Sequence, residues 1–308
     1  MRRGIILAGG SGSRLYPITA AVSKQLLPLY DKPMIYYPLS VLMLSGIQEI
    51  LIITTPGDRH LFEVLLGDGQ ALGLRLNYAV QPRPEGIAQA FVIAEAFLKG
   101  DPSALILGDN LFYGGTFIEC VRQEVGREEG ATLFTTRVQE PARYGVVEFG
   151  EDGQPISLEE KPPQARSPWA ITGLYLLDGQ APTLAHNLKP SQRGELEITD
   201  LARLYLERGN LRVKRLGRGV AWLDTGDADS LLSASTLIQT LDHRQGLKVA
   251  CIEEIAWRQG WISSPDLARL GQRWSASPYG RYLLRLAREE DPHETVHRSG
   301  PPPPRPDR

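Results

Sequence analysis

Apolar residues along the first half of the chain occur in blocks whose lengths fit strands and helices in turn. The runs at 4–8, 49–54 and 104–107 are short, continuous and rich in Ile and Leu, which is typical of strands buried on both faces. The longer block at 87–98 spaces its apolar residues as an amphipathic helix does and ends before Gly100. This rhythm predicts an α/β protein with a mixed, mostly parallel central sheet and helices on both faces.

The remaining elements follow from the same kind of pattern. In the first half we expect helices at 34–44, 59–66 and 117–129 and strands at 76–80 and 131–138. In the middle, Gly and Pro turns separate short strand candidates at 144–149, 156–160, 171–177 and 211–216, with a helix at 199–207. The pattern then becomes helical, at 228–241, 251–259, 265–270 and 279–289. We therefore expect the middle strands to extend the sheet and the last part of the chain to be helical.

Composition narrows the class of protein but not its function. With 308 residues, 42% of them hydrophobic and 23% charged, the chain is long enough for one large or two small domains. A net charge of -2 gives no reason to expect nucleic acid as a partner, and no apolar run is long enough to span a membrane. Cys120 and Cys251 lie far apart and lack zinc-site spacing, so free thiols and a cytoplasmic location are expected.

A loop of Gly and Ser follows the first predicted strand. Residues 9–13 lead to Arg14, and Lys24 comes one loop later. Successive N–H groups of such a loop form a nest for anions, and Arg and Lys add charge-assisted contacts to phosphate. A P-loop is excluded because no Lys follows the last Gly, and a dinucleotide fingerprint is excluded because Leu15 stands where its third Gly would be. The loop predicts a polyphosphate site of another kind, with a flexible turn as the plainer alternative.

Two aspartates follow apolar runs that read as strands. Asp109 comes after 104–107, and Asp224 comes after 221–223. Ligands of open α/β sheets bind outside the carboxyl ends of strands, and Mg²⁺ at such a place takes one or two carboxylates. As plainer alternatives, Asp109 could cap a loop and Asp224 could be the N-cap of the helix expected at 228. Together with the loop and its two cations, the pair favours phosphoryl or nucleotidyl transfer.

Two further loops carry polar residues beside prolines. Glu160 and Lys161 end a predicted strand, where Lys161 could hold a second phosphate and Glu160 the hydroxyls of a sugar, although solvated surface is the alternative. Gln81 opens a Pro-containing loop that closes with Gly86. Its amide both donates and accepts hydrogen bonds, as the edge of a nucleobase requires, but a rigid turn between strand and helix would have the same sequence.

These residues stand within a series of motifs that resembles the sugar nucleotidylyltransferases, in particular the members that act on dTTP. The series runs in order over about residues 1–290, so it is far more specific than any one motif. The motifs are GIILAGGSGSRLYP at 4–17, SKQLLPLYDKPMIYYP at 23–38, QPRPEGIAQA at 81–90, LGDNLFYG at 107–114, RYGVVEF at 143–149, SLEEKP at 157–162, ITGLY at 171–175, RGELEITD at 193–200, AWLDTG at 221–226, RQGLKVAC at 244–251 and EEIAWR at 253–258.

The resemblance implies a Rossmann-like three-layer fold and a Mg²⁺-dependent reaction of dTTP with α-D-glucose 1-phosphate that yields dTDP-glucose and pyrophosphate. It implies catalytic roles for Arg14, Lys24 and Lys161, and metal binding by Asp109 and Asp224. The nucleotide-binding residues it implies are Leu7, Gly9, Gly10, Ser11, Gly12, Ser13, Arg14, Gln25, Gln81, Gly86 and Asp109. The sugar-phosphate-binding residues it implies are Gly145, Glu160, Lys161 and Ile171.

The resemblance also implies regulation and assembly. A second nucleotide site would bind a dTDP-sugar as feedback ligand, and the subunits would form a homotetramer. The residues that match this second site are Lys248, Val249, Ala250, Cys251, Glu254 and Arg258. We expect a catalytic domain at 1–242, divided into a nucleotide half at about 1–140 and a sugar-phosphate half at about 141–227, then a helical regulatory segment at 243–292 and a disordered Pro-rich tail at 293–308.

Two rival functions stay open at the level of sequence. The first is the same chemistry with UTP or with another sugar 1-phosphate, because the thymine methyl group leaves no visible mark on the motifs. The second is a nucleotide-sensing protein that keeps the fold without catalysis. Against the sensor, both carboxylates and all three cations (Arg14, Lys24 and Lys161) are present together.

Overall fold

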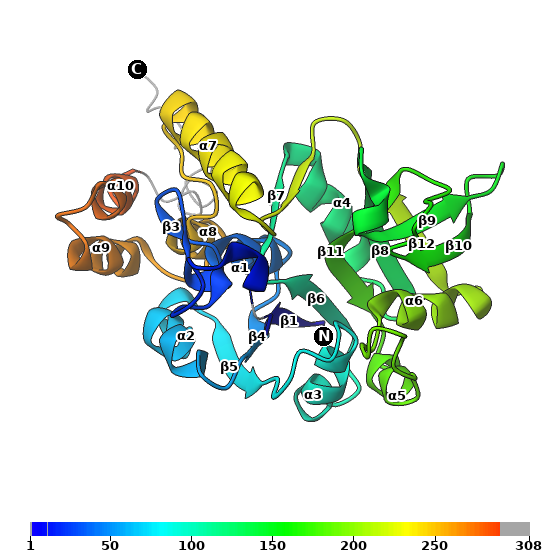
Figure 1. Ribbon diagram of the computed structural model, residues 1–308. Helices are drawn as coiled ribbons and strands as arrows, with labels where there is room; N and C mark the ends of the chain where they lie inside the picture. Colours follow the sequence, from blue (N-terminus) through cyan, green and yellow to red (C-terminus); the bar gives the residue numbers. More distant parts are fainter. Residues whose placement is uncertain (1, 11, 290–308) are drawn as a thin grey trace, which may run out of the picture.

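The computed structural model describes residues 2–10 and 12–289, and its centre is one mixed sheet (Figure 1). Strand β1 (Arg3–Ala8) lies between β4 (Glu49–Thr54) and β6 (Ser103–Leu107), and β5 (Arg75–Val80) lies beyond β4. These four strands pair in parallel. The apolar runs of β1, β4 and β6 are mostly buried, as their continuous Ile and Leu pattern predicts. Each predicted strand of this group is confirmed to within one residue.

The sheet continues on the other side of β6 with antiparallel pairing. Strand β11 (Trp169–Leu177) pairs antiparallel with β6, with β8 (Ala131–Arg137) and with β9 (Gly145–Phe149). Strand β10 (Pro155–Glu160) extends the sheet beyond β9, and β12 (Leu211–Arg215) runs parallel to β8. In the described part of the chain this sheet has nine strands. The predicted extension of the sheet by the middle strands is confirmed.

Two short antiparallel pairs lie outside the main sheet. Strands β2 (Pro28–Leu29) and β3 (Lys32–Pro33) form a hairpin, and β7 (Asn110–Tyr113) pairs with β13 (Ala221–Asp224). The hydrophobic pattern did not predict β2, β3 or β7 as strands, because segments of two to four residues are too short to show alternation. The β7–β13 pair joins segments more than a hundred residues apart, next to the carboxyl end of β6.

Helices cover both faces of the sheet. Because strand side chains alternate between the faces, Ile6 packs in one apolar cluster and Ile5 in another. Helices α1, α2, α4 and α8 contribute to the first cluster, and α3, α5 and α6 contribute to the second. The predicted three-layer α/β fold is confirmed. The helices are α1 (Tyr36–Leu44), α2 (Arg59–Leu66), α3 (Gln89–Leu98), α4 (Gly115–Val125), α5 (Ala181–His186), α6 (Ile198–Glu207), α7 (Ala228–Gln245), α8 (Ile252–Arg258), α9 (Ser264–Arg273) and α10 (Pro278–Leu286).

Some predicted helix ends are wrong. Helix α1 begins at Tyr36 and not at 34, because the residues just before it belong to the β2–β3 hairpin and the turn after it. Helix α4 ends at Val125 and not at 129, because Gly126 is its C-cap. The Val125 carbonyl accepts a hydrogen bond of 2.8 Å from Arg2 Nε in place of a bond within the helix. Helix α10 ends at Leu286 and not at 289, as the hydrophobic pattern predicted.

The C-terminal part is helical, as predicted, and lies at the end of the molecule opposite α6 and β10 (Figure 1). Helices α8, α9 and α10 share a cluster of their own around Trp257 and Leu283. Helix α7 continues to Gln245, past residue 242, where a domain boundary is expected. The division into domains stays a prediction. The tail expected at 293–308 lies outside the described residues. No helix of the described residues is both long and apolar enough to cross a bilayer.

Candidate active site

Two cavities adjoin at the carboxyl ends of β1 and β6, and both are lined by Arg14 and Asp109. The larger has a volume of about 400 Å³ and the smaller of about 210 Å³. The smaller cavity is lined by Gly10, Gly12, Ser13, Arg14, Lys24, Gln25, Asp109 and Gly226. The larger is lined by Arg14, Ile87, Leu107, Asp109, Asn110, Arg143, Tyr144, Gly145, Glu160, Lys161, Ile171, Thr172, Gly173, Tyr175, Ile198, Thr199, Trp222 and Asp224. Most of the predicted site residues therefore meet here.

The Gly-Ser loop forms one wall of the smaller cavity. Gly12 has a φ of 62°, in the left-handed region, and its carbonyl accepts a hydrogen bond of 2.8 Å from the Thr19 hydroxyl. A side chain at Gly12 would also strike Thr19 at 3.1 Å. The short helical turn Ser13–Leu15 follows at once and turns Arg14 toward both cavities. The predicted residue Ser11 lies outside the described residues.

Gln81 and Gly86, the predicted base-binding pair, lie beside the start of this loop. A Cβ on Gly9 would come within 2.1 Å of the Gln81 Oε1 atom, so a larger residue would displace the Gln81 amide from its present position. The Gln81 Nε2 atom donates to Gln89 Oε1 at 2.6 Å and to the Gly86 carbonyl at 3.4 Å. Gly9, Gln81 and Gly86 thus come together, although they line neither of the two cavities. Leu7 lies on β1, where its carbonyl accepts from Gly108 N–H at 2.9 Å.

Lys24 and Asp109 form an ion pair between the two cavities. The Lys24 Nζ atom lies 2.6 Å from Asp109 Oδ2, and the Lys24 side chain is only 6% exposed. The Asn110 side-chain amide also donates to Asp109, at 2.9 Å. Burial opposes ionisation of Asp109, but the charge of Lys24 and the hydrogen bonds from Lys24 and Asn110 together outweigh it, so the pKa of Asp109 lies below its ordinary value. Asp109 therefore stays ionised.

Asp224 reaches the same cavity from the other short strand. In the β7–β13 pair Asp224 lies opposite Asn110, which brings it beside Asp109. The alternative of Asp224 as an N-cap is wrong, because Asp227 caps α7 and accepts from Ser230 N–H at 2.9 Å. Burial raises the pKa of Asp224, the charge of Arg143 lowers it, and the charge of Asp109 raises it further. The net pKa lies above the ordinary value.

The donor set fits a magnesium ion. Two carboxylates face one cavity, where burial and the charge of Asp109 raise the pKa of Asp224 although the charge of Arg143 lowers it. Mg²⁺ in enzymes takes one or two carboxylates and completes its shell with water and phosphate oxygens. Among the described residues no cluster of three or more His, Cys, Asp or Glu suits a metal held by protein side chains alone. Asp109 and Asp224 fit an ion shared with a phosphate ligand.

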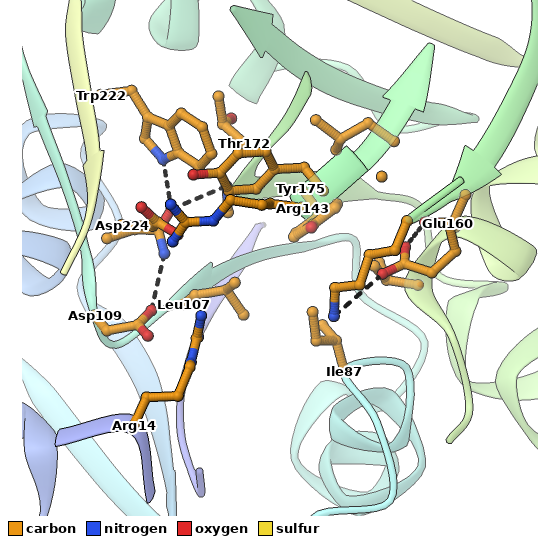
Figure 2. A pocket seen from close by; sticks show the side chains of 18 residues that line it. Arg14, Ile87, Leu107, Asp109, Arg143, Glu160, Thr172, Tyr175, Trp222 and Asp224 are labelled. Carbon is orange, nitrogen blue, oxygen red and sulfur yellow. Dashed lines mark hydrogen bonds and ion pairs between the residues drawn. The ribbon is translucent and has the colours of Figure 1, made fainter. Parts of the chain in front are cut away.

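The predicted sugar-phosphate residues all line the larger cavity, and Figure 2 shows Glu160 on the side of it away from Asp109 and Asp224. Glu160 accepts a short hydrogen bond from the Thr199 hydroxyl, and its other oxygen lies 3.7 Å from Lys161 Nζ. A Cβ on Gly145 would contact Thr199 Oγ1 at 2.9 Å, Glu160 at 3.2 Å and Ile171 at 3.2 Å. Strands β9, β10 and β11 and helix α6 therefore converge on this glycine.

Several residues of the larger cavity were missed at the level of sequence. Arg143 points toward Asp224 (Figure 2), and its Nη2 atom lies 3.1 Å from Asp227. The Trp222 indole N–H donates to Asn110 Oδ1 at 2.5 Å. The indole ring packs edge-on against the Tyr144 ring, with 5.1 Å between the ring centroids. Arg143 and Tyr144 stand inside the RYG motif, and Trp222 precedes Asp224 by two positions, so proximity to predicted residues was the available signal.

The residues predicted for a second nucleotide site do not all line one cavity. Lys248, Val249 and Ala250 line a separate cavity of about 310 Å³ beside α1 and α4. The Lys248 Nζ atom already holds Asp31 at 2.6 Å. The other three residues lie outside this cavity: Cys251 is buried, and Glu254 on α8 pairs with Arg258 at 2.7 Å.

A family model described as nucleotidyl transferase matches residues 3–240, which include the whole main sheet and both joined cavities. The chain belongs to the nucleotidyl transferase family, as its resemblance to the sugar nucleotidylyltransferases predicts. Among solved structures, a UDP-glucose pyrophosphorylase complexed with UDP-glucose has a TM-score of 0.69 at 24% identity, over 78% of this chain and 99% of that one. At this identity the likeness concerns the fold alone.

More similar relatives narrow the kind of transferase. The glucose-1-phosphate thymidylyltransferase of Neisseria meningitidis is 56% identical over 93% of this chain and 100% of its own length. That of Mycobacterium tuberculosis is 52% identical over 92% of this chain and 98% of its own. A solved Bacillus anthracis protein, provisionally assigned as glucose-1-phosphate thymidylyltransferase, is 40% identical with a TM-score of 0.72, over 77% of this chain and 95% of that one.

Proposed function

We propose that the protein is an enzyme that transfers the thymidylyl group of dTTP to α-D-glucose 1-phosphate and releases pyrophosphate. This reaction, with dTDP-glucose as its product, would be the first step of dTDP-L-rhamnose synthesis. The names of the relatives support this reaction. The observation that carries it is the joining of two cavities through Arg14 and Asp109, because a transfer between two phosphate compounds needs both in one site.

The smaller cavity suits the triphosphate. Main-chain N–H groups of the Gly-Ser loop would hold its oxygens, and Arg14 and Lys24 would balance their charge. Gln81 and Gly86 would hold the thymine, with Gln25 nearby. The contact between Gly9 and Gln81 supports this arrangement, because it ties the base-binding residue to the phosphate loop.

The larger cavity suits the sugar phosphate. Lys161 would hold its phosphate, and Glu160 would accept hydrogen bonds from glucose hydroxyls. Gly145 and the backbone near Ile171 would lie against the sugar, and the glycine leaves room that a side chain would fill. Asp109 and Asp224 would hold Mg²⁺, which supplies positive charge to the phosphates when it is bound.

The chemistry is a direct in-line displacement. A phosphate oxygen of glucose 1-phosphate attacks the α-phosphorus of dTTP and forms a new P–O bond. The bond from that phosphorus to the oxygen that bridges to the β-phosphorus breaks, and pyrophosphate leaves with the electron pair. The nucleophile is already an anion, so no side chain must take a proton. Arg14, Lys24 and Lys161 therefore act by aligning the two anions and by offsetting their repulsion.

Pyrophosphate release, measured for each nucleoside triphosphate against each of several sugar 1-phosphates, tests this function. The proposal expects release only when both substrates are present, and fastest with dTTP and glucose 1-phosphate. Faster release with UTP or with another sugar phosphate would favour the related specificity. Nucleotide binding without any release would favour a sensor and would overturn the proposal.

Regulation, assembly and location are separate proposals. We propose that a dTDP-sugar binds at the cavity of Lys248, Val249 and Ala250 as feedback ligand, which non-competitive inhibition kinetics would test. We propose a homotetramer, to be measured by light scattering. We also propose a cytoplasmic location, tested by cell fractionation and supported by the two free cysteines.

A further inference from the structure

The tripeptide 224–226, which begins with the last residue of β13, links the two candidate metal ligands. Asp224 ends the strand, Thr225 comes next with no exposed surface, and Gly226 leads to the N-cap of α7. We propose that Thr225 is a positioning residue that holds Asp109 and Asp224 at the separation a divalent cation needs. This inference rests on the proposed function.

Two donors of Thr225 meet one acceptor on the other ligand. The Thr225 hydroxyl donates to the main-chain carbonyl of Asp109 at 2.8 Å, and the Thr225 N–H donates to the same carbonyl at 3.2 Å. The pairing of β7 with β13 ends at Asn110 and Asp224, so these two bonds carry the connection one residue further. The two bonds thus join the backbone of Asp109 to Thr225, the residue next to Asp224.

The two hydrogen bonds from Thr225 have a physical purpose in this cavity. Asp109 and Asp224 repel each other before a cation arrives, and a short strand pair that ends there would tend to open. Held ligands also bind a metal more tightly than ligands that must first be brought together. The Thr225 hydroxyl proton has a second, weaker acceptor in the Met34 sulfur at 3.1 Å, and Thr225 has no surface exposed to solvent.

The neighbouring Gly226 serves the same site in another way. A Cβ at Gly226 would lie 3.1 Å from one terminal nitrogen of Arg14 and 3.3 Å from the central carbon of its guanidinium. The guanidinium thus lies against a residue without a side chain. Within this tripeptide Asp224 is one candidate ligand, Thr225 holds the backbone of the other, and Gly226 leaves room for the Arg14 guanidinium, which lines both cavities.

A purely structural role for Thr225 makes a different prediction. A buried hydroxyl that donates to a carbonyl stabilises any fold, and its loss lowers thermal stability wherever it lies. Thr135 offers the matched control. It is also fully buried, its hydroxyl donates to the Lys214 carbonyl at 3.3 Å, and it lines neither cavity.

The experiment compares Thr225→Val, Thr225→Ser and Thr135→Val in the full chain. Mn²⁺ binding to the protein without nucleotide is titrated by electron paramagnetic resonance, and the Mg²⁺ concentration for half-maximal turnover is measured with both substrates saturating. We expect Thr225→Val to weaken Mn²⁺ binding and raise the Mg²⁺ requirement by about tenfold, the usual effect of a lost contact behind a ligand. Thr225→Ser keeps the hydroxyl and should behave as the wild type, and Thr135→Val should change melting temperature alone.

Two results would overturn the inference. They are a Mg²⁺ requirement and Mn²⁺ affinity in Thr225→Val that equal those of the wild type, and the same loss in Thr225→Ser as in Thr225→Val. Failure of the proposed function looks different, because the wild type would then form no dTDP-glucose whatever its affinity for Mn²⁺.

Discussion

The two acidic residues at the centre of the site have opposite electrostatic surroundings. Lys24 holds the pKa of Asp109 below its ordinary value, whereas burial and the nearby Asp109 raise the pKa of Asp224. A carboxyl with a lowered pKa contributes stability above its unfolded pKa and loses that contribution as the pH falls. A carboxyl with a raised pKa binds its proton more tightly in the folded state, so its ionised form lowers stability at neutral pH.

Substitution of the two aspartates should therefore change stability in opposite directions. At pH 7, Asp224→Asn should raise the free energy of unfolding, because it removes an ill-compensated charge. Asp109→Asn should lower it by about 3 kcal/mol, because it leaves the buried Lys24 ammonium without its partner. Turnover should fall by about 100-fold or more in both variants, since each lacks one of the two carboxylates that would hold Mg²⁺.

Urea unfolding and steady-state kinetics of the same two proteins provide the check. Equal losses of stability in both variants would contradict the electrostatic account. Near-normal turnover of Asp109→Asn with Mg²⁺ would contradict the metal assignment.

Lys161 should act on one substrate only. Lys161→Ala should raise KM for glucose 1-phosphate by about 10- to 100-fold, the effect of losing a charged hydrogen bond, and leave KM for dTTP unchanged. Arg166→Ala is the matched control, because Arg166 is 70% exposed and only 4.0 Å from Glu159 in a neighbouring ion pair. Initial rates with each substrate varied in turn measure both constants. A parallel rise in KM for dTTP would remove Lys161 from the sugar-phosphate end.

At the scale of elements, the short β7–β13 pair decides where the second carboxylate lies. The sequence marked Asp224 as the end of an apolar run, but it also allowed an N-cap at that position. The choice depends on pairing with a strand that begins at Asn110, and four-residue strands carry too little pattern to reveal their partner. Asp227, three residues later, forms the cap together with Ser230.

The cap of α7 also reaches the site through Arg143, so its removal should affect activity as well as stability. Asp227→Ala should lower the free energy of unfolding by about 1 kcal/mol, as loss of an N-cap does. It should also lower turnover, because the Arg143 side chain loses its contact with Asp227 at 3.1 Å and keeps only the longer one to Glu140 at 3.6 Å. Ser263→Ala removes the corresponding cap of α9, which lines neither cavity.

Chemical denaturation and turnover should be measured for both cap variants. We expect similar losses of stability and a loss of turnover in Asp227→Ala alone. Equal turnover in the two variants would mean that the contact between Asp227 and Arg143 has no part in the reaction.

At the scale of the whole molecule, sequence patterns predicted the sheet well because its strands are long and apolar. The rule that ligands bind at the carboxyl ends of parallel strands also placed Asp109 and the Gly-Ser loop correctly beside each other. The pattern could not predict Arg143, Tyr144 or Trp222 as cavity residues, because an aromatic or basic residue near a strand end has the same local pattern in a core or on a surface.

The joining of the two cavities through Arg14 and Asp109 is likewise a property of the folded chain. Loops that follow different strands meet only once the sheet is assembled, so no local window of sequence contains that information. The resemblance supplied the expected partners, and the fold explains why they can act together.

The central claim is that dTTP and glucose 1-phosphate react directly with each other in this joined site. The stereochemistry at phosphorus tests it most directly. The enzyme is given dTTP with sulfur in place of one α-phosphate oxygen, in a single configuration, together with glucose 1-phosphate, and the configuration of the dTDP-glucose analogue is determined. A single in-line displacement predicts inversion at the α-phosphorus. Retention would require two displacements and a covalent enzyme intermediate, and would contradict the account.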